Sequence, residues 1–178
     1  DTLRSLISSI QARDHYTEEH SRRVTDEAVR LAENLGCTQK EIESIRIASV
    51  LHDVGKIAVP DSILLKEGKL TEEECMIIKN HPTIGENILK PITLLADERK
   101  IVQCHHERWD GKGYPLGLKG EEIPLLARVM AVVDAFDAMT NNRTYRPAMP
   151  KGEAIAELIA NKSTQFDPDI VDAYIKII

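Results

Sequence analysis

The chain has 178 residues, of which 42% are hydrophobic and 29% are charged, which indicates one globular domain with a buried core rather than a disordered segment. Aromatic residues make up only 4%, so a platform that stacks single-stranded bases is excluded. The net charge of −6, from 23 basic and 29 acidic residues, disfavours a partner that is a nucleic-acid polymer or an anionic membrane.

The apolar residues of the chain recur mainly at helical spacing, and no segment alternates like a strand. In chain order, helices are predicted over residues 3–10, 24–35, 38–51, 71–78, 82–89, 92–106, 124–139, 152–160 and 168–178. Gly36 is expected to end the second helix, and Thr38–Glu41 and Thr71–Glu74 read as capping boxes. Residues 58–68 and the glycine-rich residues 107–123 are predicted loops. The pattern predicts an all-α fold of eight or nine helices in one domain over residues 1–178.

Targeting signals are missing from this sequence. No apolar run approaches the ~18 residues of a membrane-spanning helix, and residues 1–13 lack the apolar centre of a signal peptide. Cys37, Cys75 and Cys104 form an odd, widely spaced set without a CxxC pair, which argues against a disulfide framework or a structural zinc site. We therefore expect a cytoplasmic protein without membrane contact. The chain begins without Met and within a helical pattern, which suggests a fragment of a longer protein.

Five of the six histidines stand near helix ends or near aspartates. Two adjacent pairs, His52-Asp53 and His105-His106, close predicted helices, and His20, His81 and Asp134 complete the set. Imidazole and carboxylate ligands suit divalent first-row metals, and an aspartate can bridge two ions through its two oxygens. Five histidines and two aspartates are too many for one tetrahedral ion and could serve two octahedral ions. The sixth histidine, His15, is expected to be structural or merely exposed.

Three segments of the chain carry a family resemblance. His52–Lys56 resembles the HD-x-GK core of the HD metal-dependent phosphohydrolase superfamily. His105–Pro115 is similar to the HHE-x-x-DG-x-GYP signature of the HD-GYP subfamily, and Asp134–Arg146 is similar to its D-x-x-DA-x-T…R…YR segment. The resemblance implies an all-α HD-domain helical bundle with a long glycine-rich (GYP) loop. It also implies a cyclic di-GMP phosphodiesterase that forms pGpG, GMP or both in bacterial second-messenger signalling.

The resemblance further implies a metal cofactor of two divalent transition-metal ions, iron first among them, with manganese, nickel, cobalt or zinc as options. One ion would be held by His20, His52, Asp53 and Asp134. The other would be held by Asp53, His81, His105 and His106, with Asp53 bridging the two. Some family members carry a Glu four residues before the first ligand histidine, where it helps to hold a third metal. Tyr16 stands at that position here, so two ions are expected.

Roles in catalysis and substrate binding are implied in the same way. Lys56 is expected near the scissile phosphate, where it would assist the leaving alkoxide, and Asp137 is expected to position Lys56. Arg143 and Arg146 would bind the phosphates of the substrate. In the GYP loop, Gly113, Tyr114 and Pro115 would contact the substrate, with Tyr114 stacking on guanine.

Two other functions stay open at this stage. One is an HD phosphohydrolase that acts on another nucleotide, and the other is a non-catalytic module that binds a cyclic dinucleotide or a protein partner. By resemblance, the chain is expected to be the C-terminal output part of a longer protein with an N-terminal receiver or sensor domain. A diguanylate cyclase is a further candidate partner, and dimerisation is an option.

Overall fold

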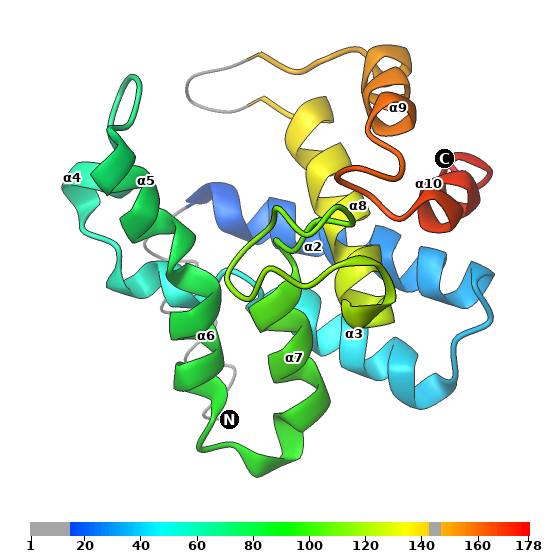
Figure 1. The fold of residues 1–178 in the computed structure, drawn as a ribbon, viewed down its shortest axis with the longest axis horizontal. Coiled ribbons are helices and arrows are strands. Elements are labelled where there is room, and N and C mark those ends of the chain that lie inside the picture. Colours follow the sequence, from blue (N-terminus) through cyan, green and yellow to red (C-terminus); the bar gives the residue numbers. More distant parts are fainter. Residues whose placement is uncertain (1–14, 143–146) are drawn as a thin grey trace.

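The structure, a computed structural model, describes residues 15–142 and 147–178. Side chains are described for residues 19–142 and 147–178. Within these residues the fold consists of helices and loops, with one isolated bridge between Lys162 and Phe166 in place of any strand. The predicted all-α class is therefore confirmed (Figure 1). The α-helices are α2 (His15–Asn34), α3 (Gln39–Leu51), α4 (Asp61–Leu64), α5 (Glu72–Lys79), α6 (His81–Leu89), α7 (Ala96–Cys104), α8 (Leu125–Thr140), α9 (Lys151–Ala160) and α10 (Pro168–Ile175). Three 3-10 helices join them: η1 (Val54–Ala58), η2 (Thr93–Leu95) and η3 (Gly120–Glu122).

The hydrophobic core lies where α2, α3, α7 and α8 pack together. Leu31, Ile45, Ile101 and Met130, one from each of these helices, are almost fully buried. In Figure 1, α4 and α5 lie at one edge of the molecule, and α9 and α10 lie at the opposite edge beside α8. None of the described helices is both long enough and apolar enough to cross a bilayer.

Most predicted helix starts lie within one residue of the observed starts, but α2 begins at His15, nine residues before the predicted start at residue 24, because residues 15–23 are mainly polar and show no apolar stripe. Both capping boxes form, at Thr38 with Glu41 and at Thr71 with Glu74, and the Asp167 side chain caps α10. Gly36 follows α2 with a φ of +74°, the left-handed conformation that glycine adopts without a steric penalty. These helix ends could be predicted from the sequence because the hydrogen bonds of a cap join residues that lie within four positions of one another.

Two other segments also differ from the predictions. The predicted continuous helix over 92–106 begins instead as η2, in which Leu95 N–H donates to the Ile92 carbonyl, and α7 starts only at Ala96. The predicted loop over 58–68 contains the short helix α4, because the Pro60 carbonyl accepts from the N–H groups of Ile63 and Leu64. Pro60, with a φ of −59°, supports that turn without needing an N–H of its own.

Gly55 brings two distant parts of the chain together. A Cβ atom at Gly55 would collide with the carbonyl oxygen of His81 and would lie 2.7 Å from the backbone nitrogen of Gly85. Only glycine therefore lets η1 lie directly against the first turn of α6. This close approach puts Asp53, at the start of η1, beside His81.

Candidate metal centre

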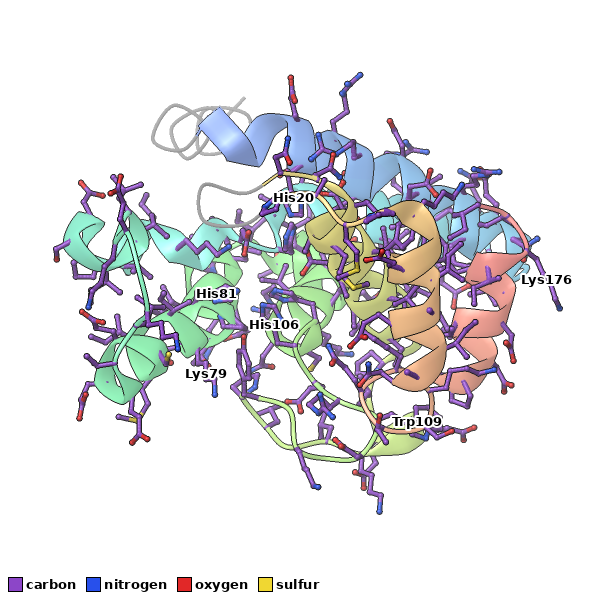
Figure 2. All side chains as sticks on the ribbon, turned by 90° about the horizontal axis from the view of Figure 1, so that it is seen from above. His20, Lys79, His81, His106, Trp109 and Lys176 are labelled. Atoms are coloured by element: carbon purple, nitrogen blue, oxygen red, sulfur yellow. The ribbon has the colours of Figure 1, made fainter. Side chains whose placement is uncertain are left out.

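Six of the seven predicted ligands gather in two groups, and within each group the ligand atoms lie within 4.8 Å of one another. The first ligand group is His20 on α2, His52 at the end of α3 and Asp134 on α8. The second ligand group is His81 on α6 together with His105 and His106, which follow α7. Figure 2 shows His20, His81 and His106 around one region in the middle of the molecule. The two groups have the membership that the family resemblance implies.

Asp53, the seventh predicted ligand, lies between the two groups. Its Oδ2 is 3.5 Å from His52 Nε2, and its Oδ1 is 3.4 Å from His81 Nε2. The two oxygens of one carboxylate therefore face different groups, which is the arrangement that a bridging ligand requires. Lys56 Nζ donates to Asp53 Oδ2 at 2.6 Å.

Three of the histidines are oriented by the backbone in the same way. His52, His81 and His105 each place Nδ1 at 2.7–2.8 Å from a carbonyl oxygen three residues earlier, at Ser49, Ile78 and Val102 respectively. A carbonyl oxygen can only accept, so each Nδ1 carries the proton and each Nε2 presents a lone pair. Each of these lone pairs can bind a metal ion.

Among the described residues, the Nε2 lone pairs of these histidines have no adequate hydrogen-bond donor. His52 Nε2 is buried and has no hydrogen-bond partner among the described residues. The Nε2 atoms of His81 and His105 lie 3.4 Å apart, although both are acceptors when Nδ1 carries the proton. Converging acceptors without a donor are unfavourable in a buried site, and a cation between them removes that cost. The residues present therefore fit metal ions.

A carboxylate rather than a carbonyl orients His20. Its Nδ1 lies 2.7 Å from Asp137 Oδ2, while its Nε2 faces Asp134 Oδ1 at 3.3 Å. Burial alone would lower the pKa of His20, but its hydrogen bonds to Asp134 and Asp137 outweigh burial and raise the pKa to about 9. The two carboxylates around His20 therefore favour a positive charge at this position, which is where a metal cation would bind.

The second ligand group is made of neutral imidazoles. Burial lowers the pKa of His106 to about 4 and the pKa of His105 well below its usual value, and it also lowers the pKa of His81. For Asp53, burial acts in the raising direction, but Lys56 and the facing imidazoles hold its pKa well below the ordinary range. Asp53 is therefore the carboxylate that brings negative charge to the second group at neutral pH.

Asp137 occupies a different place from the one expected. It was predicted to position Lys56, but its described hydrogen bonds go to His20, Arg23 and Asn141. Four contacts, two on each oxygen, use the capacity of one carboxylate. The reason for the difference is that the Asp134–Asp137 spacing puts both carboxylates on the face of α8 that packs on α2, where His20 stands.

The GYP loop closes over the second ligand group. The Tyr114 ring stacks on His106 with centroids 4.9 Å apart and planes at 30°, and Lys79 Nζ lies 5.6 Å from the centre of the same ring. A Cβ atom at Gly113 would collide with the backbone nitrogen of Arg108, so glycine is needed for this tight return. The Tyr114–Pro115 bond is cis.

Glu107 stabilises the GYP loop through its side-chain carboxylate. Its carboxylate, almost fully buried, accepts from the N–H groups of Leu116, Gly117 and Leu118 at 2.6–3.2 Å. Away from the metal centre, the ring of Trp109 packs against the Arg128 guanidinium, and Trp109 N–H donates to the Gln165 carbonyl. These contacts fasten the loop to α8 and to the segment that joins α9 and α10.

Other predictions lie outside the described part of the structure. They concern the helix predicted over residues 3–10, the substrate-binding candidates Arg143 and Arg146, and the side chains of His15 and Tyr16. Conversely, sequence reasoning gave no role to Arg23, Lys79, Glu107 or Asn141. Arg23 stands three residues after His20 and Asn141 four after Asp137, a helical spacing that could have indicated both. Lys79 and Glu107 lie within two residues of predicted ligands, but nothing in the sequence tells where their side chains point.

Comparison with known proteins places these observations in context. A family model described as HD domain matches residues 4–170. The chain is 43% identical over 183 residues to the cyclic di-GMP phosphodiesterase response regulator RpfG of Xanthomonas campestris, and 44% identical over 181 residues to a cyclic di-GMP phosphodiesterase of Thermotoga maritima. It is 39% identical over 170 residues to the 3'3'-cGAMP-specific phosphodiesterase 2 of Vibrio cholerae.

These alignments cover nearly all of this chain but only part of each relative. They include 99%, 99% and 94% of the chain, against 47%, 49% and 33% of the respective relatives. The chain therefore spans half or less of the length of the curated relatives it matches.

Solved structures share the fold at lower sequence identity. Bd1817, described as a HDG"Y"P protein from Bdellovibrio bacteriovorus, superposes with a TM-score of 0.74 at 22% identity, covering 90% of this chain and 52% of that one. The HD domain of the L. monocytogenes phosphodiesterase PgpH, solved with Cyclic-di-AMP, gives 0.67 at 20% identity and covers 97% and 94%.

Proposed function

The chain belongs to the HD-domain family, and from that premise we propose that it hydrolyses the phosphodiester bonds of cyclic di-GMP, releasing pGpG, GMP or both. The observation that carries this proposal is the pair of ligand groups joined by Asp53. Two relatives above 40% identity are named cyclic di-GMP phosphodiesterases, which supports the choice of substrate.

Each ligand group would hold one divalent first-row ion, with Asp53 contributing an oxygen to both. Nitrogen and carboxylate donors suit divalent first-row ions. Iron is placed first because of the family resemblance, with manganese, nickel, cobalt and zinc as alternatives. Such ions, when bound, make a water nucleophile available at neutral pH and neutralise charge on the phosphate oxygens. Among the residues that the structure describes, no third group of potential metal ligands is found.

The hydrolysis needs a group that receives the leaving oxygen. Water oxygen forms a bond to phosphorus, the bond from phosphorus to the 3′ oxygen breaks, and that oxygen takes up a proton. Lys56 is the proposed donor, because its ammonium lies at the carboxylate common to both ligand groups and is partly exposed. In this role Lys56 acts on the substrate from a position beside Asp53.

The GYP loop is proposed to bind the substrate beside the second ligand group. One face of the Tyr114 ring is used by His106, so a guanine would meet the other face or the edge. Gly113 and Pro115 shape the turn on which Tyr114 stands. Arg143 and Arg146 are proposed to bind the phosphates, on the strength of their motif and of the bidentate fit between guanidinium and phosphate.

Further parts of the proposal concern the whole protein. An N-terminal receiver or sensor domain is supported by a relative that is named a response regulator. A diguanylate cyclase partner and a cytoplasmic location follow from the role in second-messenger turnover. A relative specific for 3'3'-cGAMP makes other cyclic dinucleotides a specific second candidate for the substrate.

The test is hydrolysis by the purified chain, reconstituted without oxygen with Fe(II) or Mn(II). Cyclic di-GMP, 3'3'-cGAMP and Cyclic-di-AMP are supplied separately and the products are separated by ion-exchange chromatography. We expect pGpG to appear from cyclic di-GMP at the highest kcat/KM. Binding of cyclic di-GMP without turnover under any of these metals would favour a non-catalytic module, and turnover of mononucleotides alone would favour another HD phosphohydrolase.

A further inference from the structure

The structure leads us to infer that Arg23 is a positioning residue, which acts through Asp137 to hold His20 and so controls the metal affinity of the first ligand group. This inference rests on the proposed function only in that the two groups bind metal. The family motifs assign no role to Arg23, which lies on α2 one turn after His20.

The contacts form a continuous chain from Arg23 to the ligand atom. Arg23 Nε donates to Asp137 Oδ1 at 2.6 Å, and a terminal guanidinium nitrogen donates to Oδ2 at 3.2 Å. Asn141 adds a second hydrogen bond to Oδ1, at 2.9 Å. Oδ2 then accepts from His20 Nδ1 at 2.7 Å, which turns Nε2 toward Asp134.

The burial of Asp137 makes Arg23 necessary to this arrangement. Asp137 is 5% exposed, and a buried carboxylate without a cationic partner carries a large desolvation penalty. The fork of a guanidinium meets both oxygens at once, so it fixes the plane of the carboxylate as well as its charge. The orientation of the His20 ring, in turn, follows the plane of Asp137.

The second ligand group has no counterpart of this network among the described residues. Backbone carbonyls orient His81 and His105, and these are set by the helices themselves. A loss of Arg23 should therefore weaken one ion and spare the other. A purely structural role in joining α2 to α8 would lower the stability of the fold without that selectivity.

The test measures metal binding directly, independent of turnover. Arg23→Met is titrated with Mn(II) or Zn(II) against a competing chelator, and bound metal per chain is counted by elemental analysis. We expect two ions in the wild type, and in the variant one ion of unchanged affinity and one weakened about 10- to 100-fold, the usual effect of losing a residue that orients a ligand. Two reference variants assign the weakened ion to a group. His52→Ala removes a ligand of the first group, and His105→Ala removes a ligand of the second group.

The matched control breaks another arginine–aspartate pair. Arg128 Nη1 donates to Asp167 Oδ2 at 2.6 Å, with the carboxylate similarly buried, and the pair lies away from the ligand groups. Arg128→Met should lower the melting temperature while both metal affinities stay within twofold of wild type. Equal weakening of both ions in Arg23→Met, or no change in either, would overturn the inference.

A double-mutant cycle tests whether Arg23 acts through Asp137. Asp137→Asn retains an acceptor for His20 Nδ1 but removes the charge that Arg23 binds. If the path runs through Asp137, adding Arg23→Met to Asp137→Asn should weaken the ion by less than twofold more. Fully additive effects would contradict the path. If Arg23→Met does not fold, Arg23→Lys replaces it, with an expected intermediate affinity, and wild-type affinity in that variant would overturn the inference.

Discussion

The two ligand groups use the same donor chemistry but differ in what stands behind each imidazole. In the first group, His20 is backed by the Asp137 carboxylate, which Arg23 and Asn141 complete. In the second group, the Nδ1 atoms of His81 and His105 donate to carbonyls of their own or the preceding helix, and the pKa values of all three imidazoles are lowered by burial. The first group thus depends at His20 on a tertiary ion-pair network, although a backbone carbonyl orients His52, whereas the second group is oriented mainly by local backbone geometry.

If each group binds one ion, as proposed, this difference predicts that the two ions are held with unequal strength and by different parts of the fold. Asp134 and the nearby Asp137 give the first group negative charge that attracts a cation. Among the described residues, the second group draws negative charge mainly from Asp53, with Asp134 also acting on His106. Four variants break or sharpen the comparison, beginning with the residue that both groups use.

The largest effect is expected from Asp53→Ala. Because each Asp53 oxygen faces a different ligand group, its removal takes charge from both ions at once. Metal per chain should fall from two toward zero after dialysis, and turnover of cyclic di-GMP should fall to the level of metal-free protein. Elemental analysis and product chromatography measure both effects, and a variant that retained full activity would show that the bridging role is wrong.

His105→Ala should separate the two groups. It removes a ligand from the second group, while the described contacts of His20 with Asp134 and Asp137 remain. We expect one ion to be lost and the other to remain bound, with turnover greatly reduced because both charges are needed at the phosphate. Loss of both ions in this variant would mean that the groups fill cooperatively.

Lys56→Ala should leave both ions in place and slow the chemical step. Losing a positioned proton donor costs about 10²- to 10⁴-fold in rate, so kcat should fall within that range while metal content stays at two. The matched control is Lys40→Ala, which breaks an exposed lysine–aspartate pair with Asp97. That control should keep wild-type kcat, and a Lys56 variant that kept it too would assign proton donation elsewhere.

The smallest effect is expected from Lys79→Met. Lys79 contacts the Tyr114 ring from an exposed position, and a cation–π contact of that kind contributes about 0.5–1 kcal/mol. If Tyr114 binds the substrate, KM for cyclic di-GMP should rise about two- to fivefold with kcat unchanged. The control is Lys90→Met, at an exposed position just after the C-terminal end of α6. A change in kcat without a change in KM would contradict the assignment to substrate binding.

Much of the fold could be predicted from local patterns. The capping boxes at Thr38 and Thr71 and the cap at Asp167 need only neighbouring residues, so they formed as expected. The helix expected over 92–106 was interrupted near Leu95, because that side chain is buried and the turn before it tightens. Periodicity alone does not report such a change, since an apolar residue fits either helix type.

For the metal centre, the sequence by itself determined which residue types were available and, through the motif order, which of them belong together. The sequence could not determine the partner of Asp137. The one-turn spacing from Asp134 places both side chains on one face of α8, but it does not tell which element packs against that face. Only the packing of α2 on α8 decided that this partner is His20, with Arg23 beside it. Likewise, a glycine at position 55 permits a close approach of another backbone, but only the tertiary structure decided that α6 is what approaches. Hydrogen bonds within one helix end are encoded by adjacent residues, whereas contacts between helices depend on how the whole core packs.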